Sequence, residues 1–259
     1  MNTSSTSRRL VVAALTSLLL GAVAYQALPG HATTPPTTHL AAARSDRPPI
    51  IQLPPPRAFV RVIDNAYLPF VPGSRWVYGG ETPDGRERIV VRVLERTKRI
   101  EGIPATVVRD TVRLDGEIIE DTFDWYGQDR RGNVWYLGEF SRAYENGEVV
   151  STEGSWEAGV DGARAGIVMF GHPRAGLSYR QEYYAGHAED EGKVLTVSTR
   201  AATAAGRFRD VLMTEDTTPL EADIAELKFY APGVGLVLEF DLSPEPGRTE
   251  LLRMDLPGR

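Results

Sequence analysis

Carboxylates and a tryptophan alternate in one glycine-rich stretch near the middle of this 259-residue chain. Glu153, Glu157 and Asp161 follow one another at intervals of four residues, with Trp156 among them. Two carboxylates beside an aromatic ring are the groups with which glycoside hydrolases bind and cleave sugars. An interval of four aligns side chains only in a helix, which the surrounding glycines disfavour. The stretch therefore predicts solvated loop carboxylates first, ligand or ion contacts second, and a carboxylate-dependent hydrolase third.

Other reactive patterns are missing from the sequence. The chain has no Cys, and its histidines downstream of the N-terminal segment, His39, His172 and His187, are far apart. No Gly-x-Ser-x-Gly elbow marks a serine nucleophile, and the histidines do not form a zinc-binding pattern. The net charge is −6 without a basic block, which disfavours nucleic-acid binding. We expect no catalytic residue, no metal and no cofactor, and a protein that is not an enzyme.

Aromatic side chains recur on the segments that alternate apolar and polar residues. Such side chains fill the space between sheets in most β cores, or they line a cavity for an apolar ligand. If such a cavity exists, the residues expected to contact the ligand are Trp76, Trp125, Trp135, Trp156, Tyr179, Phe229, Glu157 and Asp161.

The elements that position these residues are short β-strands. Turn signals such as Asp84-Gly85, Asp115-Gly116 and Asn146-Gly147 follow one another closely, and no segment keeps an apolar period of 3.6 residues. Such spacing predicts an all-β, antiparallel fold of about 10–12 strands. The expected strands cover residues 74–79, 88–97, 104–114, 117–125, 133–139, 144–153, 178–184, 192–199, 207–216, 224–230, 235–242 and 248–255.

The chain repeats itself at an offset of 103 or 104 residues. Trp125-Tyr126 is matched by Phe229-Tyr230, and Gly132 by Gly235. We therefore predict an internal duplication of two units, about 72–153 and 175–255, joined by a glycine-rich connection at 154–176. Neither unit could bury its apolar face alone, so together they would form a β-sandwich or a half-barrel.

The N-terminus predicts export. Arg8-Arg9 precede a short apolar run, and Gly30 and Ala32 are small residues at the −3 and −1 positions of a cleavage site, which is the pattern of a signal peptide covering residues 1–32. The alternative is a retained membrane anchor. Residues 33–59 are rich in Pro, Thr and Ala and are expected to form a disordered spacer, followed by a single domain at 60–259. Without Cys there is no lipid-anchored thiol, so we expect a secreted or cell-envelope protein.

Asp110 does not fit the strand on which it lies. It falls on the same face as Val108, Val112 and Leu114. A carboxylate that faces a core needs a partner or a raised pKa. The sequence predicts a salt bridge to an arginine, or a position on an edge strand.

Several motifs resemble a group of exported bacterial proteins that is frequent in actinobacteria. The resemblance covers about residues 60–242 and implies a folded exported domain, without transferring any catalytic residue. The Tyr-Ala-Pro-Gly-Val-Gly turn is also similar to one in periplasmic half-barrel proteins related to lipoprotein carriers. The motifs lie at residues 63–67, 72–78, 124–126, 132–136, 151–163 and 230–237.

These observations favour an exported, non-enzymatic protein that binds or carries a small hydrophobic or amphiphilic molecule of the cell envelope. Its aromatic-rich halves and the missing catalytic motifs are the basis of that expectation. The alternatives are a structural or interaction module held near the membrane by the spacer, and the carboxylate-dependent hydrolase described above.

Overall fold

The fold is almost entirely antiparallel β-structure. The computed structural model describes residues 47–242 and 246–257. Within these residues, sixteen strands form one sheet, and the helical structure consists of a single 3-10 turn, Pro56–Ala58. The strands up to β8 are β1 (Arg75–Thr82), β2 (Gly85–Ile100), β3 (Ile103–Leu114), β4 (Glu117–Gln128), β5 (Val134–Phe140), β6 (Ala143–Glu145), β7 (Glu148–Ser151) and β8 (Trp156–Glu157).

The remaining strands belong to the same sheet. They are β9 (Arg164–Met169), β10 (Ser178–Arg180), β11 (Glu182–Tyr183), β12 (Glu191–Thr203), β13 (Gly206–Thr218), β14 (Glu221–Ala231), β15 (Gly235–Asp241) and β16 (Gly247–Asp255). The number exceeds the predicted 10–12 because six of the sixteen described strands, namely β6, β7, β8, β9, β10 and β11, are only two to six residues long.

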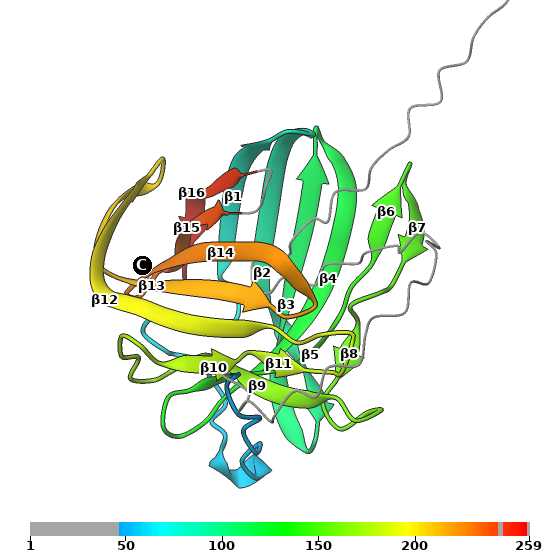
Figure 1. The fold of residues 1–259 in the computed structure, drawn as a ribbon, viewed down its shortest axis with the longest axis vertical. Helices are drawn as coiled ribbons and strands as arrows, with labels where there is room; N and C mark the ends of the chain where they lie inside the picture. The colour runs from blue at the N-terminus through cyan, green and yellow to red at the C-terminus, as the bar shows by residue number, and fades with distance from the viewer. Residues whose placement is uncertain (1–46, 243–245, 258–259) are drawn as a thin grey trace, which may run out of the picture.

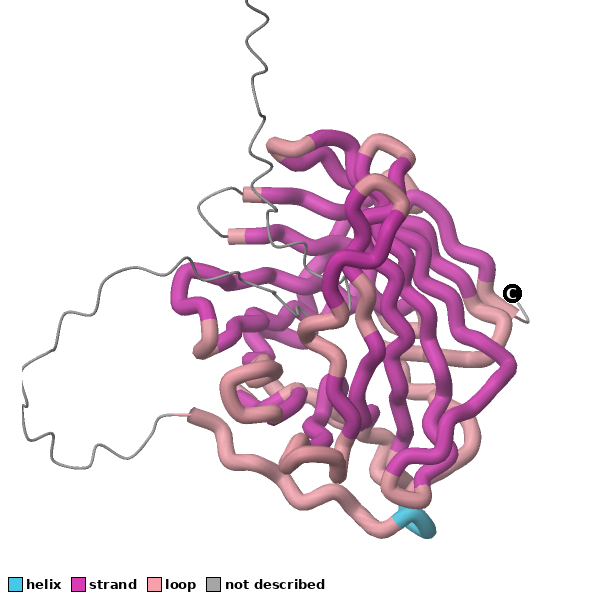
Figure 2. Tube along the Cα trace, turned by 90° about the vertical axis from the view of Figure 1, so that its right-hand side faces the viewer, coloured by secondary structure: helices cyan, strands magenta, loops and turns pink. Residues whose placement is uncertain are grey.

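The sheet is continuous and strongly curved (Figure 1, Figure 2). Its strand order is β10-β12-β13-β14-β15-β16-β1-β2-β3-β4-β5-β9-β11. The two halves join edge to edge where β16 pairs with β1, so they do not form two separate sheets. The half-barrel is therefore the better of the two predicted descriptions. Strand twist and β-bulges produce such curvature, and a bulge lies in β2 between Val93 and Thr97.

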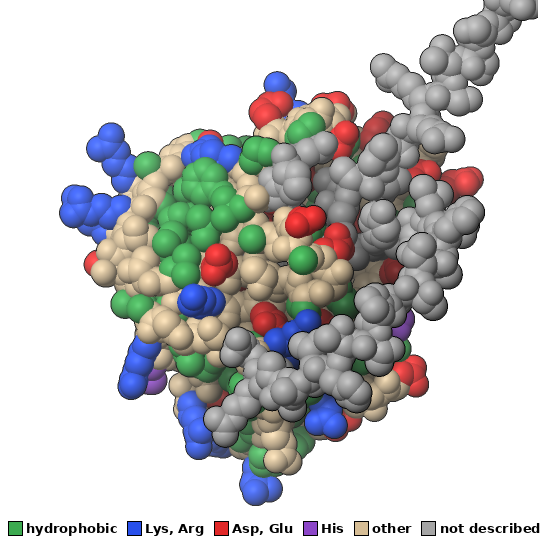
Figure 3. Space-filling view, viewed as in Figure 1, with side chains coloured by type: hydrophobic (Ala, Val, Ile, Leu, Met, Phe, Trp, Pro, Cys, Tyr) green, Lys and Arg blue, Asp and Glu red, His purple; other side chains and the backbone are tan. Residues whose placement is uncertain are grey.

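The two halves follow the same sequence of hairpins. Strands β2 to β5 follow β1 as β12 to β15 follow β10, and β3 and β13 begin 103 residues apart, at Ile103 and Gly206. This correspondence is what an internal repeat would produce, and the repeat itself stays a prediction. One difference is clear: the tip of the β12–β13 hairpin folds onto β16, where Ala205 N donates to Leu251 O at 3.1 Å. Figure 3 shows hydrophobic side chains over β15 and β16, in the bend of this hairpin.

The glycine-rich connection differs from its prediction. Residues 154–176 were expected to be a connection between the two units, yet they contain β8 and β9, both paired with β5. Gly166 explains why. A Cβ atom at this position would lie 2.5 Å from Arg180 O, so glycine lets the backbones approach closely rather than ending the strand.

The predicted spacer, residues 33–59, lies only partly within the described residues. Residues 33–46 lie outside the described residues, as do the predicted signal peptide 1–32 and its cleavage site. Residues 47–59, however, lie against the domain. Ile51 and Leu53 pack on the core, and Arg180 Nε donates to Pro48 O at 2.9 Å. Proline-rich chain stays extended and leaves its carbonyls free to accept, so such a segment docks without joining the sheet.

The segment before β1 fills the inside of the curved sheet. Ile63, Leu68 and Phe70 are buried, and the Phe70 ring packs 5.0 Å from Tyr126. This core holds the inner face of the sheet in place. The outer face of the same strands forms the site described below. In the described part of the chain, no helix is long and apolar enough to cross a bilayer.

Candidate functional site

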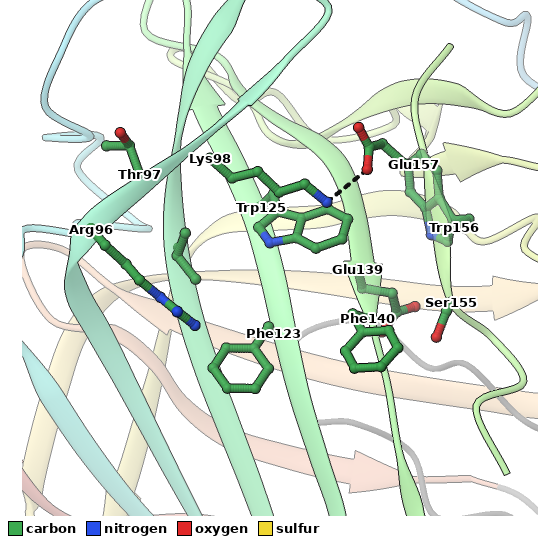
Figure 4. Close-up of a pocket in the computed structure, with 11 residues that line it drawn as sticks. Arg96, Thr97, Lys98, Phe123, Trp125, Glu139, Phe140, Ser155, Trp156 and Glu157 are labelled. Atoms are coloured by element: carbon green, nitrogen blue, oxygen red, sulfur yellow. Dashed lines mark hydrogen bonds and ion pairs between the residues drawn. The ribbon is translucent and has the colours of Figure 1, made fainter. Parts of the chain in front are cut away.

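An open cleft of about 690 Å³ lies across β2, β3, β4, β5 and β8. Small-molecule sites usually have volumes of about 300–1,000 Å³. We call it the outer cleft, because it opens on the face of the sheet that points away from β13 and β14 (Figure 4). The residues that line it are Arg96, Thr97, Lys98, Val107, Phe123, Trp125, Glu139, Phe140, Ser155, Trp156 and Glu157.

Strand β4 supplies the aromatic wall of the outer cleft. Successive side chains of a strand point to opposite faces. Phe123 and Trp125 therefore share the outer face, and Asp124 and Tyr126 the inner face. The inner position of Asp124 is fixed by a hydrogen bond that it accepts from the Tyr136 hydroxyl at 2.8 Å. The cleft thus uses the outer face of a strand whose inner face is part of the core.

Lys98 is the central cation of the outer cleft. Its Nζ lies 3.2 Å from the centroid of the Trp125 ring, and it donates to Glu157 Oε2 at 2.6 Å. Lys98 lies over the indole, and only 7% of Trp125 is exposed. The cleft therefore combines an aromatic surface with an ammonium group that is held from two sides.

Arginines surround the second aromatic ring, Phe123. The guanidinium carbons of Arg96, Arg109 and Arg142 lie 5.0, 5.4 and 5.8 Å from its centroid. Arg109 and Arg142 are both paired with the buried carboxylate of Asp121. That pairing leaves Arg96 as the most exposed cation beside the aromatic wall.

The far rim of the outer cleft is formed where β5 meets β8. Phe140 is 41% exposed, while Trp156 is buried with its ring edge-on to Tyr136 at 5.3 Å. Gly138 allows the backbones of β5 and β8 to approach this closely, because a Cβ atom at residue 138 would lie 2.3 Å from Trp156 O. The φ of Gly138 is +131°, which also favours glycine.

Three of the eight predicted ligand-contact residues, Trp125, Trp156 and Glu157, lie together in the outer cleft. The others do not join them. Trp76 is in the core and donates from Nε1 to Val234 O at 2.7 Å. Trp135 is also buried and donates to Asp129 Oδ2 at 3.0 Å.

The remaining predicted contacts lie elsewhere. Tyr179 is buried edge-on to Phe170 at 5.0 Å, and Phe229 is buried 5.8 Å from Phe240. Asp161 is exposed in a turn with φ of +48°. These residues serve packing and turn formation, which is why their aromatic or acidic type alone did not locate a site.

The three carboxylates of the glycine-rich stretch do not converge. Glu153 and Asp161 are exposed, while Glu157 is paired with Lys98. The arrangement lacks the two facing carboxylates that glycoside hydrolysis requires. Among the described residues, no group of three or more His, Asp or Glu side chains is arranged to hold a metal ion.

Sequence reasoning missed eight of the eleven lining residues, among them Arg96, Lys98, Phe123 and Phe140. The available signal was the spacing of two residues between Phe123 and Trp125 on β4, repeated by Arg96 and Lys98 on β2. Strand β3 lies between these two strands. The bulge after Val93 obscured this signal, because the bulge shifts the register with which β2 pairs with β3.

The prediction for Asp110 was also wrong. It lies on β3, between β2 and β4, and it makes no salt bridge. Burial raises the pKa of Asp110 well above its usual range, and the nearby carboxylates Asp124 and Glu120 raise it further. Asp110 thus belongs to a larger set of buried acids on the inner face.

Comparisons with known proteins give two distant structural likenesses. A Bacteroides fragilis protein, provisionally described as exported and as having a YmcC-like fold, is 16% identical with a TM-score of 0.43, over 74% of this chain and all of that one (100%). A Parabacteroides distasonis protein, provisionally described as a lipoprotein, is 12% identical with a TM-score of 0.40, over 74% of this chain and 99% of that one. No protein-family model and no curated protein sequence gives a significant match. Function is therefore argued from the site itself.

Proposed function

We propose that this chain is an exported, non-enzymatic protein that binds a small amphiphilic molecule in the outer cleft. The observation that carries the proposal is the placement of Lys98 between the Trp125 ring and Glu157 in a cleft of about 690 Å³. The aromatic side chains of the cleft would bury the apolar part of a ligand, and the cation at their edge would bind an anionic headgroup.

The chemistry of the cleft favours an anionic over a cationic ligand. Arg96 is exposed beside Phe123, and Lys98 can exchange Glu157 for a ligand anion, because the two side chains remain 36% and 33% exposed. A pair this exposed is worth only about 0.2–1 kcal/mol, so exchanging its partner costs little.

Export is supported by the signal-peptide pattern at residues 1–32 and by the motifs that resemble exported bacterial proteins. We place the protein in the cell envelope or the surrounding medium. There, amphiphilic molecules would be the natural ligands of a cleft with this composition.

The proposal is tested by titrating the full chain with dodecyl phosphate below its critical micelle concentration, with tryptophan fluorescence as the readout. We expect saturable binding that Trp125→Ala and Lys98→Met each weaken by about tenfold, which corresponds to about 1.4 kcal/mol. Lys193→Met removes the same charge from an exposed position on β12 and should bind like the parent protein. Equal binding by Trp125→Ala and the parent protein would refute the proposal.

A further inference from the structure

The inner face of β3, β4 and β5 carries three adjacent carboxylates, one of which, Glu139, also borders the outer cleft. Asp124 is the cross-strand neighbour of Glu139. On the other side, Asp124 pairs with Val108 and Asp110 pairs with Thr122, so Asp110 and Asp124 are diagonal neighbours. Cross-strand and diagonal side chains on one face of a sheet lie within reach of each other. We call Asp110, Asp124 and Glu139 the inner carboxylate row.

Most oxygens of this row lack a hydrogen-bond partner. Both carboxylate oxygens of Asp110, both of Glu139 and Oδ2 of Asp124 are unpartnered, and so is the Tyr126 hydroxyl. Asp110 and Asp124 are each 1% exposed and Glu139 is 2% exposed. Buried polar groups are nearly always paired, because an unpaired one costs free energy. The row therefore calls for a donor that the described side chains do not supply.

The second half of the sheet contains such a donor. Lys228 lies on β14, 104 residues after Asp124 on β4, which is the offset of the predicted repeat. It is 0% exposed, and its Nζ lies 2.8 Å from Glu226 Oε2 and 3.4 Å from Asp216 Oδ2. An ammonium group is thus the partner of the acids in the second half, whereas the first half has a further acid at the corresponding position.

We propose that the inner carboxylate row binds an organic cation. The ammonium group of this cation would pair with the acids of the first half, as Lys228 pairs with the acids of the second half. Tyr126 and Tyr136 stack at 4.9 Å beside the row, and the unpartnered Tyr126 hydroxyl gives the ligand a further polar contact. The row forms no metal-binding group. Further buried carboxyl groups, Glu87, Glu120, Glu182 and Asp190, lie near the row, and a bound polycation would favour their ionised forms. A molecule with several amines, such as a linear oligoamine, matches this charge distribution best.

The test measures thermal unfolding of the full chain with and without spermidine at constant ionic strength. We expect a saturable rise of several degrees in Tm, because a ligand that binds only the folded state stabilises it. The double variant Asp110→Asn/Glu139→Gln should fold, since it replaces two buried carboxyl groups that lack hydrogen-bond partners by amides of the same shape, and it should lose the rise. Glu148→Gln/Glu153→Gln removes the same charge from exposed positions and should keep it.

Equilibrium dialysis with radiolabelled spermidine gives a second readout for Asp110→Asn alone, in case the double variant does not fold. Bound spermidine should fall by at least about tenfold in this variant, the effect of losing roughly 1.4 kcal/mol. The proposal is overturned if spermidine leaves the Tm of the parent protein unchanged, or if the double variant shows the same rise as the parent. It is also overturned if calcium chloride produces the rise and spermidine does not.

Discussion

Lys98 Nζ lies 3.2 Å from the centroid of Trp125 and 2.6 Å from Glu157 Oε2. The three residues come from β2, β4 and β8, so the contact joins two central strands to a short strand of the glycine-rich stretch. This arrangement turns the outer face of an ordinary meander into a polar–aromatic cleft. It also gives the glycine-rich stretch a defined role, which is to hold Glu157 opposite the hairpin that carries Lys98.

The contact between Lys98 and Trp125 should be measurable as a coupling energy. Lys98→Met and Trp125→Leu, alone and combined, should give a coupling of about 0.5–1 kcal/mol in a double-mutant cycle, as expected for a partly exposed cation–π pair. Urea unfolding of the four proteins provides the free energies. Purely additive effects would contradict the contact.

Lys228 should be far more important for stability than Lys98. Lys228→Met leaves Asp216, Glu226 and Glu239 without their shared cation, and removing one partner of a buried ion pair typically costs about 3–5 kcal/mol. We expect this loss in urea unfolding near neutral pH.

A matched change gives the control for Lys228. Lys193→Met removes the same group from an exposed site and should change the free energy of unfolding by less than about 0.5 kcal/mol. If the two variants unfolded alike, the acids around Lys228 would have to be uncharged in the folded protein.

Much of the fold could be predicted from the sequence because its turns are local. Asp115-Gly116 and Asn146-Gly147 form the β3–β4 and β6–β7 turns, and their residue types alone indicate such turns. The strand β9 was missed, since its glycine serves close packing against Arg180 O, a contact between residues distant in sequence.

The site could be predicted only in part, for a different reason. Both faces of β4 are aromatic: Phe123 and Trp125 point outward, and Tyr126 points inward to stack on Tyr136. Alternation therefore does not say which face is the core. The inner acids were also hidden, because a carboxylate in a strand usually indicates a solvent-facing position, and only Asp110 stood out among apolar neighbours.

Gly138 should be required for the rim of the outer cleft. Gly138→Ala places a Cβ atom 2.3 Å from Trp156 O at a φ of +131°, so β8 must shift. We expect a loss of about 2–4 kcal/mol in unfolding free energy, as for overpacking combined with backbone strain, together with weaker dodecyl phosphate binding.

Gly147→Ala separates backbone strain from crowding. Gly147 also has a positive φ, +81°, but no atom lies within 4 Å of its added Cβ. It should cost only about 1 kcal/mol and leave dodecyl phosphate binding unchanged. An equally small effect of Gly138→Ala would mean that β8 does not pack against β5 as described.

The buried acids should make the protein more stable in mild acid than at alkaline pH. Burial raises the pKa of Glu87, Glu120 and Asp124 to about 7, whereas the unfolded chain has carboxyl pKa values of about 4. Between about pH 4 and pH 7 the folded protein holds protons that the unfolded chain has released. The free energy of unfolding must therefore fall as pH rises through this window.

Urea unfolding at a series of pH values from mild acid to mild alkali measures this slope directly. Glu120→Gln should flatten it, because the amide does not titrate, while Glu148→Gln, an exposed change on β7, should leave it unaltered. Glu250 and Asp255 act in the opposite direction, since hydrogen bonds from Arg248 and Arg253 lower their pKa values, but both groups face solvent and their contribution is small. A stability that rises from pH 5 to pH 8 would mean that the inner acids are ionised and paired in the folded protein, and the orphaned oxygens of Asp110 and Glu139 would then need another explanation.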